Sequence, residues 1–280
     1  TLRELGQAKE AISLLRDTVA QHPDFAEAQR DLAHALLLNG DYIEGWKQNR
    51  WRWQTSSLIG GERHQDVPEW VGQTLTGKRI LLWDEQGFGD AIQFVRFVPW
   101  VAELGAEVVL EVQAELVSLF QSVEGAATVI ARGEDLPRVD FQISLLDLGD
   151  AFRTDSFAIP NTVPYLNVQK STGGNDRPRV GLCWAGNPNH DNDQNRSIEF
   201  DIMRPWLELC GIDFYNLQFG DRAIDAGAES RLNSMPTKPK DFLDTAKFVD
   251  SLDLVITVDS AMAHLAGAFG KPVWLLLPFA

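Results

Sequence analysis

Short apolar runs alternate with helical patterns along most of this 280-residue chain, and this alternation constrains the fold more than any other feature. In its first series, apolar runs at 79–84 and 107–112 flank a helical pattern over 91–104, in which Pro99 predicts a kink. The second series has apolar runs at 179–184, 214–219, 254–258 and 272–277, with helical patterns between them. Strands that alternate with helices predict parallel sheets with right-handed crossovers.

Polar, glycine-rich stretches divide the chain into parts. Residues 167–178 are expected to be a linker between the two series, and residues 54–77 a linker that wraps a surface. We therefore expect a first Rossmann-like half over 78–166 and a second over 179–280. Open α/β sheets bind ligands outside the carboxyl ends of their strands, so the expected site is the cleft between the halves.

Residues 1–53 have a purely helical pattern instead. Gly6 and Gly40 are 34 residues apart, and Ala8 and Tyr42 have the same offset. A period of 34 with Gly at the turn between helices resembles the tetratricopeptide repeat. The predicted fold class is thus α/β, with two Rossmann-like halves preceded by a short all-α repeat segment.

Two arrangements can bury the apolar face of the repeat segment, because a single repeat cannot bury it alone. Either further repeats precede Thr1, or the segment packs on the domain that follows it. The second arrangement is favoured by Trp46, Trp51 and Trp53. Their spacing does not fit one narrow stripe, so at least one of them is expected to contact another domain.

Charge and composition exclude several classes of partner. The chain has 25 Lys+Arg against 40 Asp+Glu, a net charge of −15, which argues against binding to nucleic acid or to an anionic membrane surface. No apolar run approaches the ~20 residues of a transmembrane helix. Cys183 and Cys210 are predicted to be reduced core thiols, so a cytoplasmic location is expected. With Thr1 first and Ala280 straight after an apolar run, the sequence is interpreted as part of a longer protein.

The first candidate motif is Gly87-Phe-Gly-Asp90, between a predicted strand and a helix. Gly87 and Gly89 would allow a ligand to approach the backbone closely. Asp90 lies at the helix start, where it either caps the helix or acts on a ligand. A dinucleotide fingerprint is excluded, because the third glycine is missing and Asp90 would repel a pyrophosphate.

The second motif spans residues 258–264 and joins a strand to a helix. A helix that opens at Asp259 and Ser260 offers free N–H groups and a positive dipole end, which suit a phosphate. His264 is four residues after Ser260, hence on the same helix face. In the alternative interpretation, Asp259 or Ser260 only caps the helix and His264 belongs to the core.

The third motif is a long polar loop from Trp184 to Ser197. Gly186 permits a close approach of the backbone, and Arg196 is placed to hold a diphosphate. His190 and the acidic residues near it match no metal motif in order or spacing, so no metal is expected and solvated loop charges are favoured.

The three motifs together resemble the heptosyltransferase-type (family 9) glycosyltransferases of the GT-B fold. The motifs that carry the resemblance are G-F-G-D-A-I, W-A-G-N-P with R-S-I, and V-D-S-A-M-A-H-L-A-G-A-F-G. The resemblance spans about 78–280, and the chain looks like bacterial proteins in which tetratricopeptide repeats precede such a domain. It implies a metal-independent, inverting transfer from a nucleotide-diphospho-sugar, with no cofactor.

The resemblance also implies residue roles. Asp90 matches the family's catalytic base, and Arg196 matches the basic residue that holds the donor phosphates. The donor-binding residues implied are Gly87, Gly89, Trp184, Gly186, Asn187, Arg196, Asp259, Ser260, Ala261 and His264. Ser260-Ala261 replaces the family's Thr-Gly, and both halves are shorter than in full heptosyltransferases.

The leading hypothesis is a glycosyltransferase with a nucleotide-sugar donor and a protein or glycan acceptor, the repeats offering a site for a protein partner. The alternative is a non-catalytic repeat scaffold whose degenerate transferase domain binds a nucleotide or a protein partner. A nucleotide-sugar epimerase is less favoured, because that chemistry needs an acid–base pair and no carboxylate cluster accompanies the 258–264 motif.

Overall fold

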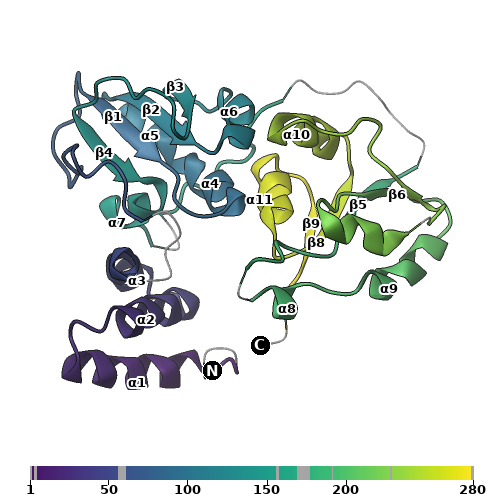
Figure 1. Ribbon diagram of the computed structural model, residues 1–280, viewed down its shortest axis with the longest axis horizontal. Helices are drawn as coiled ribbons and strands as arrows, with labels where there is room; N and C mark the ends of the chain where they lie inside the picture. Colours follow the sequence, from purple (N-terminus) through teal and green to yellow (C-terminus); the bar gives the residue numbers. More distant parts are fainter. Residues whose placement is uncertain are drawn as a thin grey trace.

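The computed structural model describes residues 2, 5–55, 61–155, 158–168, 177–190, 192–227 and 229–278. A short helical segment precedes two α/β halves, each built on a parallel sheet (Figure 1). This architecture confirms the predicted fold class. The first sheet has the strand order β3-β2-β1-β4. Its strands are β1 (Arg79–Trp83), β2 (Glu107–Val112), β3 (Ala126–Ala131) and β4 (Phe141–Ser144).

The helical pattern predicted over 91–104 is divided in the structure. α4 (Phe88–Phe94) passes through a 3₁₀ turn, η2 (Val95–Phe97), into α5 (Val98–Glu103). Pro99 lies in the first turn of α5, where its missing N–H costs no intrahelical bond. The remaining helices of this half are α6 (Ala114–Phe120), the 3₁₀ turn η3 (Leu145–Asp147) and α7 (Leu148–Ala151).

The second sheet has the strand order β7-β6-β5-β8-β9. Its strands are β5 (Arg179–Cys183), β6 (Asp213–Asn216), β7 (Leu232–Asn233), β8 (Leu254–Val258) and β9 (Val273–Leu276). Its helices are α8 (Asp193–Arg196), α9 (Phe200–Met203), α10 (Phe242–Asp250) and α11 (Ala261–Ala268). Two 3₁₀ turns, η4 (Arg204–Glu208) and η5 (Asp221–Ala226), complete the half.

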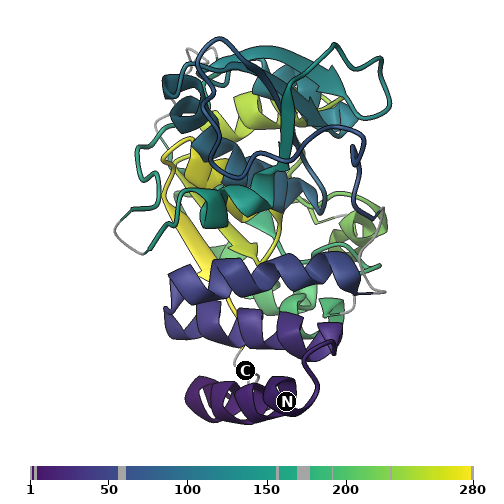
Figure 2. The same ribbon diagram turned by 90° about the vertical axis from the view of Figure 1, so that its left-hand side faces the viewer.

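The repeat segment contains α1 (Ala8–Gln21), α2 (Ala26–Asn39), α3 (Tyr42–Asn49) and the 3₁₀ turn η1 (Arg50–Gln54). Figures 1 and 2 show the three helices stacked in order, with α3 next to the first half. Gly40 ends α2 at φ +89°, a conformation that favours glycine. A Cβ at Gly45 would lie 2.8 Å from Leu37 Cδ2, so glycine allows α2 and α3 to pack closely.

Tryptophans join the repeat segment to the first half. Trp46 lies edge-on to Phe94 at 5.6 Å between ring centroids, and its ring covers Gly149, where a Cβ would be 2.8 Å from Cδ2 of the indole. Trp53 packs on Trp83 at 5.4 Å. The prediction that at least one of these tryptophans contacts another domain is confirmed.

The predicted linkers lie partly outside the described residues, namely at 56–60 and 169–176. Within 54–77, Trp70 and Leu75 are buried in the first half, and the Trp70 amide donates a hydrogen bond to the Gln142 carbonyl (2.9 Å). Of the two cysteines, Cys183 is buried but Cys210 is exposed, so the core prediction was wrong for Cys210. No helix among the described residues combines the length and apolar character that a membrane span requires.

The two halves contact each other directly through helices that follow their central strands. α4 packs on α11 (Figure 1), and Phe88 packs on Phe242 of α10 at 4.8 Å between ring centroids. Tyr165, on the segment that leaves the first half, donates a hydrogen bond through its amide to the Ala268 carbonyl (3.0 Å) and through its hydroxyl to the Ile92 carbonyl (3.1 Å). A single apolar cluster therefore extends through both halves.

Candidate active site

Asp90 lies in the first turn of α4, directly after the turn that leaves β1. Its Oδ2 accepts a hydrogen bond from the Gly87 amide (3.1 Å), so this carboxylate caps the helix start. Gly87 is exposed, whereas Gly89 and Asp90 are partly buried. The capping role considered from the sequence is thus present, and it fixes the direction of the carboxylate.

Burial between the halves raises the pKa of the Asp90 carboxyl. The hydrogen bond from Gly87 and the charge of His264 oppose this shift, and the charge of Asp259 adds to it. A helix N-terminus by itself favours the ionised form of a carboxyl group. Desolvation outweighs that effect here, so Asp90 is a stronger base than its position at a helix start alone would make it.

His264 meets the Asp90 turn from the other half. A Cβ at Gly89 would lie 2.8 Å from His264 Cδ2 and 3.4 Å from Ala261 Cα, so only glycine fits between the helices without a shift. Burial lowers the pKa of His264, with the charges of Asp90 and Asp259 opposing the shift. The contact brings the His264 ring of one half against Gly89 of the other, next to Asp90, whose charge interacts with the imidazole.

Ser260 begins α11 and connects this helix to the core of the second half. Its Oγ accepts a hydrogen bond from the Met262 amide (3.3 Å) and lies 3.0 Å from the Thr257 hydroxyl. The Cys183 thiol, at the end of β5, is 3.8 Å from the same oxygen. Asp259 is exposed at the end of β8. The first turn of α11 therefore lies at the carboxyl edge of the second sheet, where α/β proteins bind ligands.

Trp184 and Asn187 take different places in the loop after β5. The Trp184 indole is 0% exposed and packs on Phe200 at 4.7 Å between ring centroids, so any contact of Trp184 with a donor is limited to its backbone. Asn187 is exposed, and its Oδ1 accepts a hydrogen bond from the Asn189 amide (3.0 Å).

Arg196 lies over Gly186, where a Cβ would be 2.7 Å from its Nε. Its side chain is 13% exposed, 3.6 Å from Asp193 Oδ1, and its buried Nε has no hydrogen-bond partner among the described residues. Arg222 approaches the other oxygen of Asp193 at 3.8 Å. Arg222 also pairs with Asp225 at 3.7 Å, so the two guanidinium groups and the two carboxylates form one chain of ion pairs.

Gln218 is a residue of this site that the sequence argument missed. Its Oε1 accepts hydrogen bonds from the amides of Trp184 (3.1 Å) and Ala185 (2.9 Å), and its Nε2 donates to the Ala185 carbonyl (3.1 Å). It fixes the loop after β5 to the end of β6. The available signal was a glutamine inside the apolar run at 214–219.

The predicted residues therefore form two groups. Gly89, Asp90, Ala261 and His264 meet between α4 and α11, whereas Gly186 and Arg196 meet in the loop after β5. Ser260 links the groups, since it precedes Ala261 and contacts Cys183. A cavity of about 550 Å³ lies elsewhere, at the amino ends of β8 and β9. Among the described residues, no three His, Cys, Asp or Glu side chains are gathered as a metal site requires.

Comparisons with known proteins define first the class of the fold. The tetratricopeptide repeat family matches residues 2–44. The structure of ADP-heptose lps heptosyltransferase II from E. coli has a TM-score of 0.51 at 14% identity and covers 71% of this chain and 84% of its own. A glycosyl transferase of family 9 from Veillonella parvula has a TM-score of 0.51 at 12% identity over 74% of this chain and 83% of its own. Residues 2–44 thus match a tetratricopeptide repeat, and the α/β part shares the fold of family 9 glycosyltransferases.

A relative in sequence extends across both parts. Protein FlbA of Caulobacter vibrioides is 28% identical over 90% of this chain. The alignment covers 48% of FlbA, so the chain spans about half the length of this relative.

Proposed function

We propose that the chain carries a glycosyltransferase that moves a sugar from a nucleotide-diphospho-sugar to a hydroxyl of a protein or glycan acceptor, without a metal and with inversion. One observation carries the proposal: the turn that holds Asp90 packs directly against the first turn of α11, which holds His264. A base from one half thereby lies next to a helix N-terminus of the other half, and a helix N-terminus is suited to bind a phosphate. The acceptor side is assigned to 78–166 and the donor side to 179–280.

In the first half, Asp90 acts as the base. In a single displacement, the acceptor oxygen forms a bond to the anomeric carbon while the bond from that carbon to the diphosphate oxygen breaks. The acceptor proton passes to the Asp90 carboxylate. Because burial raises the pKa of Asp90, the carboxylate is better matched to this task than an exposed aspartate.

In the second half, Arg196 and the first turn of α11 stabilise the leaving diphosphate. The buried Nε of Arg196 has no hydrogen-bond partner among the described residues and lies 3.6 Å from Asp193 Oδ1, so it can donate a hydrogen bond to an anion. The helix start at Ser260 adds the positive end of the macrodipole. These cationic groups match the charge that develops on the leaving group as the glycosidic bond breaks.

The test measures transfer from a panel of nucleotide-sugars. Because the E. coli relative is named for ADP-heptose, that donor belongs in the panel beside UDP-, GDP- and other ADP-sugars. Asp90→Asn should abolish transfer while leaving the affinity for the nucleoside diphosphate within about twofold. Asp140→Asn, which changes an exposed carboxylate of the same half, serves as the matched control and should behave as the unchanged protein.

Each finer element of the proposal has its own readout. Transfer should persist in EDTA, and the NMR coupling constants of the new linkage should report inversion at the anomeric carbon. Unchanged turnover in Asp90→Asn would refute the role of this residue. Binding of a nucleoside diphosphate without transfer or hydrolysis from any donor would favour the scaffold alternative, which the replacement of Thr-Gly by Ser260-Ala261 motivates.

A further inference from the structure

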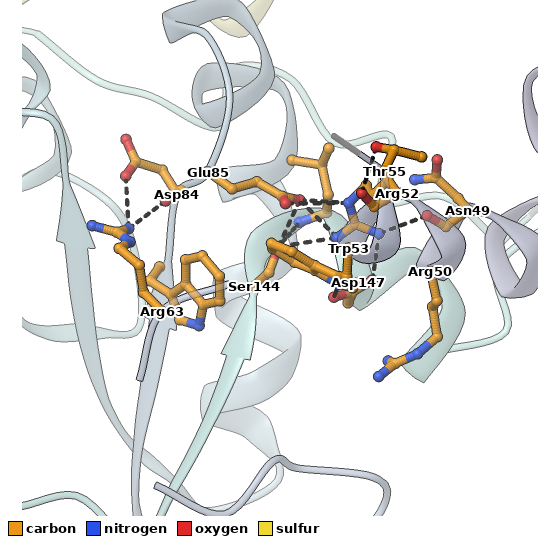
Figure 3. A network of polar contacts seen from close by, with 12 residues as sticks. Asn49, Arg50, Arg52, Trp53, Thr55, Arg63, Asp84, Glu85, Ser144 and Asp147 are labelled. Carbon is orange, nitrogen blue, oxygen red and sulfur yellow. Dashed lines mark hydrogen bonds and ion pairs between the residues drawn. The ribbon is translucent and has the colours of Figure 1, made fainter. Parts of the chain in front are cut away.

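A buried arginine of the repeat segment occupies the carboxyl edge of the first sheet (Figure 3). Arg52, in η1, is 3% exposed and lies beside the ends of β1 and β4. β1 pairs with β2 on one side and with β4 on the other, so the strand order reverses here. At such a point an open α/β sheet has the crevice that usually receives a ligand. In this protein, a side chain from another part of the chain enters it.

The guanidinium of Arg52 is fully engaged. Its Nε and Nη2 donate to the Glu85 carboxylate at 2.7 to 3.2 Å, and its Nη1 donates to Asp147 Oδ1 at 2.9 Å. Nη1 also donates to the Asn49 carbonyl (3.1 Å), and Nη2 reaches the Ser144 hydroxyl (3.5 Å). Arg52 thus connects the segment that follows β1 with the one that follows β4.

Both carboxylates depend on this cation. Glu85 and Asp147 are buried, and two carboxylates around one guanidinium leave the group with one excess negative charge. Ser144 donates to Glu85 at 2.8 Å, and Trp53 Nε1 donates to Asp147 at 3.2 Å. Removal of the cation would leave the buried Glu85 and Asp147 carboxylates without the guanidinium that contacts both, which a protein tolerates poorly.

A short stretch of backbone connects this network to Asp90. Glu85 is two residues before Gly87, whose amide is hydrogen-bonded to the Asp90 carboxylate. The preceding residue, Asp84, is held separately by Arg132 at 2.6 Å. The turn at 84–87 is therefore held by two ion pairs, Asp84 with Arg132 and Glu85 with Arg52. The second of these comes from the repeat segment.

We propose that Arg52 is a positioning residue of the acceptor half, which sets the conformation of the turn at 84–87 and through it the place of the Asp90 carboxylate. The inference rests on the proposed function, since Asp90 acts as the base there. On this inference the repeat segment supports the catalytic base directly, in addition to any role in binding a protein partner.

The experiment compares Arg52→Lys and Arg52→Met with a matched control, Arg50→Met. Lysine keeps the charge but lacks the planar fork that reaches Glu85 and Asp147 together. Arg50 is on the same element, pairs with Glu69 at 2.5 Å, and points away from Glu85 in Figure 3. Its charge also interacts with Asp147, so the control removes a charge that acts on this carboxylate but no contact with Glu85. Two readouts are taken on folded protein: the kinetic constants of transfer, and amide hydrogen exchange at residues 86–92, with α6 as the internal reference.

In Arg52→Lys, kcat should fall about 10- to 100-fold while KM for the donor stays within about twofold, because the donor half is untouched. Exchange at 86–92 should accelerate about tenfold or more relative to α6. Arg50→Met should change neither readout. If Arg52→Met does not fold, the kinetic constants and the hydrogen exchange of Arg52→Lys alone test the positioning role.

The possible failures are distinguishable. If the unchanged protein transfers sugar and Arg52→Lys matches it in both kcat and exchange, the positioning role is refuted and the proposed function stands. If the unchanged protein shows no transfer, the proposed function fails, and the exchange at 86–92 alone decides whether Arg52 sets this turn. A loss of thermal stability with both readouts unchanged would reduce Arg52 to a structural role and overturn the inference.

Discussion

Gly89→Ala tests whether the two halves really meet at the Asp90 turn. The added methyl group would lie 2.8 Å from His264 Cδ2 and 3.4 Å from the Ala261 backbone, closer to the ring than carbon atoms approach without a shift. Either the imidazole rotates or α4 and α11 separate slightly. Overpacking of this kind costs about 1–3 kcal/mol of the free energy of unfolding. At roughly 2–4 °C per kcal/mol, the Tm should fall by about 2–12 °C.

The assay is thermal and urea unfolding of four proteins in a double-mutant cycle: the unchanged chain, Gly89→Ala, His264→Ala and the double variant. Because the nearest atoms belong to the His264 ring, Gly89→Ala should be less destabilising by about 0.5–3 kcal/mol when the ring is absent. Gly267→Ala is the control, since Gly267 lies in α11 with nothing within 4 Å of its Cβ position. Alanine there should gain up to about 1 kcal/mol from helix propensity.

Two results would refute the reasoning. One is a Gly89→Ala protein as stable as the unchanged chain, which would mean that the helices do not touch at this residue in solution. The other is the same loss of stability with and without the His264 ring, which would assign the cost to another neighbour.

Three further predictions concern the site and its support. Burial raises the pKa of Asp90, so the cost to stability is absent below the ordinary value near ~4, grows as the pH rises from there to the pKa of the folded state, and is complete above it. Asp90→Asn should therefore be more stable than the unchanged protein at pH 7, with the difference vanishing as urea unfolding is measured down to about pH 3. Arg196→Ala should weaken nucleoside diphosphate binding at least about tenfold in titration calorimetry, since hydrogen bonds to charged groups contribute ~1.5–3 kcal/mol; unchanged affinity would exclude Arg196 from the donor site. Trp46→Ala should cost up to about 3–5 kcal/mol, because the ring is wedged against Phe94 and Gly149, and limited proteolysis should then cut the chain near the end of η1; a protease pattern identical to that of the unchanged chain would contradict this packing.

The fold could be predicted because its signals are local. The apolar run at 254–258 coincides with β8, and the restart after the second linker coincides with β5 (Arg179–Cys183). The predicted helix over 91–104 is broken next to Pro99, where a kink was expected: three residues form a 3₁₀ turn just before it. Apolar periodicity does not distinguish a continuous helix from a broken one, because both present the same buried face.

The site could be predicted only where one segment carries its own chemistry. The motif 258–264 shows a helix start with a histidine one turn later, and this is what the structure contains. Glu85 and Asp147, the partners of Arg52, are 33 and 95 residues away along the chain, so no local sequence pattern predicts these contacts. The shift of the Asp90 pKa was likewise hidden, because desolvation depends on a helix from the other half.

The distance along the chain between Arg52 and Asp147 has a consequence during synthesis. The two residues are 95 positions apart, and a ribosome adds about 5–20 residues per second, so the arginine waits about 5–20 s before its second carboxylate exists. The ring partners of Trp53 and Trp46, Trp83 and Phe94, are synthesised earlier in that interval. The ion pairs of Arg52 are therefore completed last, only after β4 (Phe141–Ser144) and the turn after it have been synthesised.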